Sequence, residues 1–159
     1  IWLDAGASDC AAVEAIASRR LNGQFVHRII VGLESLDSHD QLAQMVSAVG
    51  ASRLVFSLDL KEGCPLTKIP AWRERNSLDI VRDIVPLGIQ QLLVLDLARV
   101  GVGQGTGTET LCSQVAQSWP HIELISGGGI NSRIDVERLV AAGLSRVLVA
   151  SALHDGRIA

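Results

Sequence analysis

Short, unbroken runs of aliphatic residues recur along the chain, and between them apolar residues return at helical spacing. Such runs are typical of strands that are buried on both faces of a parallel sheet. The expected strands cover residues 1–3, 27–31, 54–58, 92–97, 122–125 and 147–150. The expected helices cover residues 10–20, 40–49, 77–85, 109–118 and 132–142. Because strand and helix alternate, we predict an α/β protein with a parallel sheet and right-handed crossovers.

Polar residues stand where the predicted helices begin. Ser8 and Asp9 precede the first helix, and Asn76 precedes the third. Side chains of these types accept hydrogen bonds from the free amides of a first helical turn. Ser132 and Asp135 have the spacing of a capping box at the start of the last helix. These signals support the predicted helix starts.

Polar side chains and glycines follow the carboxyl ends of the predicted strands, and Asp59 comes directly after the third strand. Both barrels and open α/β sheets bind their ligands at this end. The pattern alone leaves these two architectures open. A length of 159 residues fits an open doubly wound sheet better than a complete eight-unit barrel, which needs more than about 200 residues.

Three consecutive glycines, Gly127 to Gly129, separate a strand-like run from the helix that opens at Ser132. Glycine lets the backbone approach a ligand closely, and the positive end of a helix attracts anions. This order predicts a phosphate cradle. The alternative is that the glycines only form a tight, well-packed turn.

Composition narrows the class of protein. Hydrophobic residues make up 48% of the chain and the mean hydropathy is +0.31, which suits a buried parallel sheet. No apolar run approaches the roughly 20 residues of a membrane span and no signal peptide is visible, so we expect a cytoplasmic protein without membrane contact. The net charge of −3, without a basic cluster, argues against nucleic acid as a partner.

The three cysteines, Cys10, Cys64 and Cys112, share no metal-type spacing with one another or with the histidines. We therefore expect reduced cysteines and no metal site. The chain starts at Ile1 almost inside a strand and ends soon after another strand-like run. From this we expect a fragment of a longer protein.

Four segments carry a resemblance: Phe56 to Asp59, Asp96 to Gly101, Ser126 to Ile130, and Val149 to Leu153. Together they resemble the HisA/HisF family of histidine-biosynthesis (β/α)8 barrels, most closely a HisA-related branch of one-carbon metabolism in methanogens and methylotrophs. The resemblance implies a single TIM-barrel domain over residues 1–159 that covers strands three to eight of the family. It also implies an Amadori-type isomerase of a phosphorylated aminosugar or ribonucleotide that needs no cofactor.

The resemblance also assigns roles. Asp59 matches the strand-five carboxylate of the two that transfer protons, and the strand-one partner has no counterpart in this sequence. Leu95 stands where the family usually has a catalytic threonine. One phosphate is expected at Gly127, Gly128, Gly129, Ala150 and Ser151, and the other at Gly6 and Gly32.

Six further residues are candidate substrate contacts, each with a simpler alternative. Arg99 follows a strand end and can steer phosphate, whereas Asp4 at such a position is more often structural. Gly101 and Gly103 belong to a glycine-rich segment that either closes over a ligand or is merely flexible. Trp72 and His154 are expected to stack on or face a substrate, or else to pack.

Two other functions remain open. The first is a divergent barrel enzyme of one-carbon or pterin-type cofactor metabolism that acts on a phosphorylated substrate, which Leu95 supports. The second is a phosphate-ligand-binding protein without catalysis. A barrel fragment would expose a sheet edge and an apolar inner wall, so we also expect self-association or aggregation.

Overall fold

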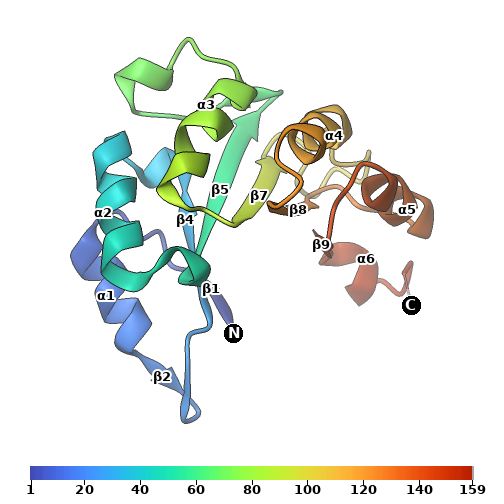
Figure 1. Ribbon diagram of the computed structural model, residues 1–159. Coiled ribbons are helices and arrows are strands. Elements are labelled where there is room, and N and C mark those ends of the chain that lie inside the picture. The colour runs from blue at the N-terminus through green and yellow to red at the C-terminus, as the bar shows by residue number, and fades with distance from the viewer. Residues whose placement is uncertain (159) are drawn as a thin grey trace.

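The structure, a computed structural model, describes residues 1–158 and contains six parallel strands whose order in space follows their order in the chain (Figure 1). The strands are β1 (Trp2–Asp4), β4 (Arg28–Gly32), β5 (Leu54–Lys61), β7 (Gln91–Asp96), β8 (Glu123–Gly127) and β9 (Arg146–Leu148). A doubly wound sheet reverses its strand order at a switch point, and these six strands show no reversal. Of the two architectures, the sheet therefore has the order of a barrel.

Helices connect successive strands. They are α1 (Cys10–Ser18), α2 (His39–Val49), α3 (Ser77–Ile84), α4 (Glu109–Ser118), α5 (Arg133–Ala141) and the short α6 (Ser151–His154). The predicted caps are confirmed: Asp9 and Asn76 each accept a backbone N–H, and Ser132 forms the capping box with Asp135. Among residues 1–158, no helix is both long and apolar enough to cross a membrane.

Two small hairpins were not predicted. The helix expected to reach residue 20 ends at Ser18, and β2 (Arg20–Leu21) pairs with β3 (Gln24–Phe25). Asn22 and Gly23 both have positive φ between these strands, which the twist of a two-residue hairpin requires. In the expected loop over 61–75, β6 (Cys64–Pro65) folds back on β5, and the 3-10 turn η3 (Pro70–Trp72) follows. Further 3-10 turns are η1 (Leu33–Ser35), η2 (Ala51–Arg53) and η4 (Val85–Leu87).

Alternation along the strands divides the interior into two layers. Phe56 and Leu58 of β5 belong to the large core that the helices cover, whereas Val55 points to the opposite face of the sheet. There it packs with Leu93 and Ile125 in a separate small cluster. Figure 1 shows the helices along the outer side of the curved sheet. The face that carries Val55 is therefore the inner wall.

A contact between the first and last strands shows how strongly the sheet curves. In a flat sheet of this order, β1 and β9 would lie about 24 Å apart, because neighbouring strands are about 4.8 Å apart. The guanidinium carbon of Arg146 on β9 lies only 5.2 Å from the ring centroid of Trp2 on β1. Arg146 also pairs with Glu123 of β8. The six strands thus form a half-barrel, consistent with part of a TIM barrel.

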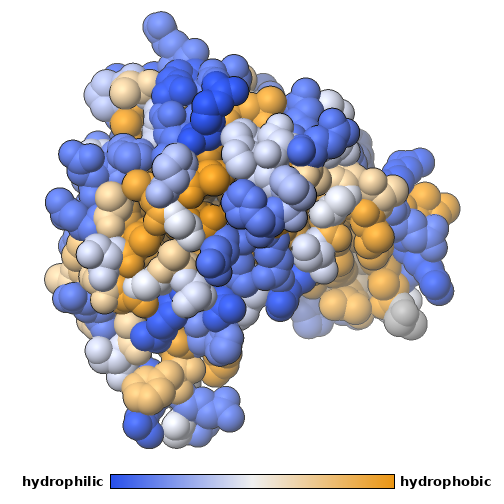
Figure 2. Space-filling view, viewed as in Figure 1, coloured by the Kyte–Doolittle hydropathy of each residue, from blue (hydrophilic) through white to orange (hydrophobic). Residues whose placement is uncertain are grey.

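Exposed apolar side chains gather near the end of the arc where α5, α6 and β9 lie (Figure 2). Four of them are Ile134, Val140, Leu148 and Leu153, each more than 40% exposed. Leu148 lies on β9 in register with Gly127. Apolar surface at this edge of the sheet is therefore open to contact with other chains.

Candidate functional site

Asp59 lies at the carboxyl end of β5 on the inner wall, since it shares the face of Val55. Its side chain is only 6% exposed. The Ser57 hydroxyl donates to Oδ1 at 2.8 Å, while the buried Oδ2 has no hydrogen-bond partner among residues 1–158. Burial, followed by the adjacent carboxyl group of Glu34 and its negative charge, raises the pKa of Asp59 to about 8. Asp59 is therefore protonated at neutral pH and can donate a proton.

Glu34, in η1 directly after β4, is a site residue that the sequence analysis missed. The Ser35 hydroxyl donates to its Oε1 at 2.9 Å. Partial desolvation opposes its charged form, but the adjacent carboxyl group of Asp59, together with Ser35 and the charge of Lys68, lowers the pKa of Glu34. The available signal was its place two residues beyond Gly32, at the end of the strand beside β5.

The expected phosphate site at Gly6 and Gly32 is lined by carboxylates. A Cβ on Gly32 would lie 2.3 Å from Oε2 of Glu34, so that carboxylate fills the space beside the glycine. The Gly6 amide donates to Oδ1 of Asp4 at 3.2 Å, which makes Asp4 a cap for its own loop. Two negative side chains here oppose a bound phosphate. The structure does not support this part of the prediction.

The other expected phosphate site lines a cavity of about 690 Å³ at the mouth of the half-barrel. Among its lining residues are Gly101, Gly103, Gly128, Gly129, Ala150 and Ser151, all singled out from the sequence. Leu95 also lines it and is the register partner of Asp59 on the adjacent strand. The cavity thus begins one strand away from the buried carboxyl group.

Close packing explains much of the glycine stretch. A Cβ on Gly127 would lie 2.6 Å from Cβ of Leu148, and one on Gly129 would lie 2.5 Å from the Gly105 carbonyl oxygen. Gly128 and Gly129 also have positive φ. The tight-turn alternative therefore accounts for the residue type. Within residues 1–158, however, the amides of Gly128 and Gly129 have no acceptor, so they remain available to a ligand.

Part of the start of α5, where the sequence predicts an anion, is already occupied by a carboxylate of the chain itself. Asp135 accepts from the amides of Asn131 and Ser132, at 3.0 and 2.9 Å. The backbone hydrogen bond from Asn131, outweighing burial, lowers the pKa of Asp135. Arg157 instead brings positive charge to the cavity lining and also pairs with Asp155 at 2.8 Å. Nothing in the sequence distinguished Arg157 from other surface arginines.

The glycine-rich connection after β7 is held against the glycine stretch of β8. The Gly105 amide donates to the Gly129 carbonyl at 3.0 Å. Thr108 bonds to the Ser126 hydroxyl at 2.8 Å, and Ser126 donates to the Val94 carbonyl at 2.8 Å. The second half of this connection is thus anchored to the sheet.

Three expected substrate contacts lie away from the main cavity. Trp72 is 2% exposed and its indole N–H donates to Asp83 at 2.8 Å, so it packs in the core and cannot stack on a substrate. Arg99 lines a separate cavity of about 420 Å³. His154 is exposed on α6 and does not line the main cavity.

No group of three or more metal-binding side chains occurs among the described residues. Cys10, Cys64 and Cys112 are all free thiols.

The family match and similar known proteins both concern histidine biosynthesis. Residues 1–159 match the family described as histidine biosynthesis protein. Relatives from two strains of Thermus thermophilus are each 37% identical over 134 residues, and one from Yersinia pestis strain Pestoides F is 30% identical over 136 residues. Each alignment covers 82% of this chain and 55% of the relative. All three are named as phosphoribosyl imidazole-4-carboxamide isomerases, and the chain spans about half their length.

Proposed function

Because the chain belongs to the histidine biosynthesis protein family, we propose that it contributes the same isomerisation that its relatives' names describe. The reaction is an Amadori rearrangement, in which an aminoaldose carrying two phosphoribosyl groups becomes an aminoketose. The observation that carries the proposal is Asp59, a buried carboxyl group with a raised pKa at the ligand end of the half-barrel.

Asp59 acts as the general acid in this proposal. Its proton goes to the ring oxygen of the aminoaldose, the bond from that oxygen to C1 breaks, and the nitrogen lone pair forms a C=N bond. A base then removes the proton from C2. The C2 hydroxyl then loses its proton and C1 gains one, which completes the ketone. The ring oxygen and C1 each gain a proton while C2 and its hydroxyl each lose one, so the protons balance. We assign no residue of this chain to the base.

One phosphate of the substrate is proposed to bind at the amides of Gly128 and Gly129, with Ser151 and Arg157 around it. Backbone amides and an arginine are the usual donors to phosphate oxygens. The support is that these groups line one cavity and that the two amides lack acceptors within residues 1–158. The substrate then extends past Leu95 toward Asp59.

Arg157→Gln tests this site against a matched change, Arg133→Gln, at an arginine on α5 outside the cavity. We expect at least about tenfold weaker binding of inorganic phosphate for Arg157→Gln, since a charged donor contributes about 1.5–3 kcal/mol. Arg133→Gln should bind like the wild type. The measurement is the shift of the Gly128 and Gly129 amide signals during an NMR titration. Equal affinities for all three proteins would contradict the site.

The six strands are proposed to correspond to strands three to eight of an eight-stranded barrel, in one domain over residues 1–159. Their sequential parallel order and the half-barrel curvature support this. Sheet edges at β1 and β9 and the exposed Leu148 support self-association of the chain. Sedimentation equilibrium should give a mass above that of the 16.9 kDa monomer. A monomer at high concentration would contradict this.

Leu95 favours a second candidate function. It places an apolar side chain between Asp59 and the cavity, where a hydroxyl would serve the isomerisation. A divergent enzyme of the one-carbon branch, acting on another phosphorylated substrate, or a binding protein without catalysis would also accommodate leucine. Turnover of the isomerase substrate separates these candidates.

The decisive assay combines this chain with the part of a Thermus thermophilus relative that it does not match, and follows substrate conversion. We expect turnover with the wild-type chain and a loss of about 10²–10⁴-fold with Asp59→Asn, which cannot supply the proton. The complementary Thermus segment alone is the blank. Folded wild-type chain that converts no substrate would favour the second candidate, and equal rates for Asp59→Asn would remove Asp59 from the reaction.

A further inference from the structure

We propose that Glu34 is a positioning residue that shares one proton with Asp59, so that the two carboxyl groups work as an acid pair at the mouth of the half-barrel. This rests on the proposed function, in which Asp59 is the acid. Glu34 lies in η1 directly after β4, and Asp59 lies on the adjacent strand β5. Glu34 was not among the residues that the sequence resemblance assigned to catalysis.

Strand register and the turn η1 bring the two side chains together. Gly32, the last residue of β4, is the partner of Ser57 on β5, and Asp59 follows two residues later on the same face of that strand. Glu34 lies in η1, and its carboxyl group lies over Gly32. Because neighbouring parallel strands are about 4.8 Å apart, this places the Glu34 carboxyl group beside the end of β5 that carries Asp59.

Gly32 provides the room that this arrangement needs. Its φ is −80°, which any residue can adopt, so the backbone does not require glycine here. The nearest atoms to an added Cβ would all belong to the Glu34 carboxyl group, at 2.3, 2.4 and 2.7 Å. An alanine at this position would displace that carboxyl group. The glycine is therefore explained by Glu34 lying over it.

The hydrogen bonds of Asp59 also favour a protonated carboxyl group. Oδ1 accepts from Ser57, but the buried Oδ2 has no donor among residues 1–158. A buried carboxylate oxygen without a donor is costly, whereas a protonated Oδ2 can donate to Glu34. Burial and Glu34 raise the pKa of Asp59, and the bond from Asp59, against the effect of burial, helps to lower the pKa of Glu34. The proton therefore resides on Asp59.

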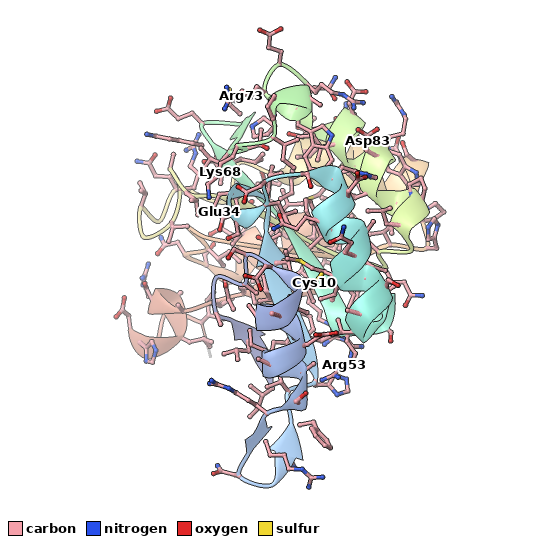
Figure 3. All side chains as sticks on the ribbon, turned by 90° about the vertical axis from the view of Figure 1, so that its left-hand side faces the viewer. Cys10, Glu34, Arg53, Lys68, Arg73 and Asp83 are labelled. Atoms are coloured by element: carbon pink, nitrogen blue, oxygen red, sulfur yellow. The ribbon has the colours of Figure 1, made fainter. Side chains whose placement is uncertain are left out.

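Lys68 and Ser35 complete the surroundings of the pair. Figure 3 shows Lys68, from the connection after β6, beside Glu34. Its charge favours the Glu34 carboxylate, and Ser35 donates to the same group. When Asp59 gives its proton to the substrate oxygen, its O–H bond breaks and two carboxylates face each other. The ammonium group of Lys68 offsets part of this repulsion until Asp59 is protonated again.

The test is a carbon-13 NMR titration of the Asp59 carboxyl group in this 159-residue chain. The variant Glu34→Gln removes the partner charge, and Glu74→Gln removes the same charge from an exposed position on the connection after β6. We expect an apparent pKa of about 8 in the wild type and in Glu74→Gln. In Glu34→Gln it should fall by about one unit or more.

Gly32→Ala provides a second route that leaves both carboxyl groups in the chain. Its Cβ should push Glu34 aside and lower the Asp59 pKa in the same direction. An unchanged Asp59 titration in folded Glu34→Gln, or in folded Gly32→Ala, would overturn the pair. Because the titration needs no substrate, it gives its answer even if the assembled protein shows no isomerase turnover.

If turnover is present, the limb of the kcat/KM pH profile that reports Asp59 should move with the titration. A limb that stays in place while the NMR titration moves would overturn the role of Glu34 in the reaction.

Discussion

At the scale of single residues, Asp59 is a buried carboxyl group that lies close to the main cavity without lining it. Its burial is costly when it is charged, and its place beside Leu95 puts it one strand from the cavity. Groups with strongly shifted pKa values cluster at functional sites for this reason. The cost in stability is itself measurable.

The raised pKa of Asp59 predicts how stability depends on pH. The folded state holds the proton more tightly than the unfolded state, in which the carboxyl group has the ordinary pKa of 3.8. The contribution of Asp59 to the free energy of unfolding is therefore full below about pH 4 and is lost as the pH rises toward about 8.

Asp59→Asn should remove this slope and, at pH 9, exceed the wild type by about 1–3 kcal/mol in the free energy of unfolding. Urea denaturation at several pH values measures it. The matched variant Asp37→Asn changes an exposed aspartate and should keep the wild-type slope. Parallel curves for Asp59→Asn and the wild type would show that Asp59 is not a buried, protonated acid.

Asp59 could be predicted from sequence because its position after a buried strand follows from local pattern. Glu34 and Arg157 could not, because their importance depends on what lies beside them in space. Glu34 matters through strand register with β5, and Arg157 through its place at the cavity. For Trp72 the packing alternative is confirmed and stacking on a substrate is not, because its indole N–H donates to Asp83 on α3.

At the scale of elements, two glycine-rich connections pack against each other. Gly129 and Gly101 have almost the same φ, 77° and 78°, so alanine is strained by a similar amount at both. A Cβ on Gly129 would meet the Gly105 and Arg99 carbonyl oxygens at 2.5 and 2.8 Å. One on Gly101 would meet nothing within 4 Å.

Gly129→Ala should therefore destabilise the protein more than Gly101→Ala, by about 1–3 kcal/mol, since the clashing atoms are backbone. Denaturant unfolding of the two variants gives the difference directly, and Gly101→Ala is the control for positive φ. Equal losses would mean that the two connections do not pack as described.

Most elements followed from the hydrophobic pattern, with ends displaced by a few residues. The helix over 109–118 was predicted to the residue. The β2–β3 hairpin was missed although Asn22 and Gly23 are a strong hairpin signal, because the helical pattern before it was extended too far. The capping role of Asp135 was predicted, but not its consequence that this carboxylate already occupies the amides of Asn131 and Ser132.

At the scale of the whole molecule, the order of strands and the curvature of the sheet decide the architecture. Neither is contained in the alternation of strands and helices, which suits a barrel and an open sheet equally. Trp2 and Arg146 are 144 positions apart in the sequence, yet their side chains meet across the inner wall. In the sequence, only the resemblance to a barrel family predicts that the sheet is curved.

We propose that this chain supplies the acid and the phosphate cavity of a histidine-pathway isomerase. Growth complementation tests it most directly, in a strain that lacks the isomerase and expresses this chain together with the unmatched part of the Thermus thermophilus relative. We predict growth without histidine for the wild-type chain and no growth for Asp59→Asn at equal protein levels. Failure of the folded wild-type pair to restore growth, or equal growth with Asp59→Asn, would contradict the account.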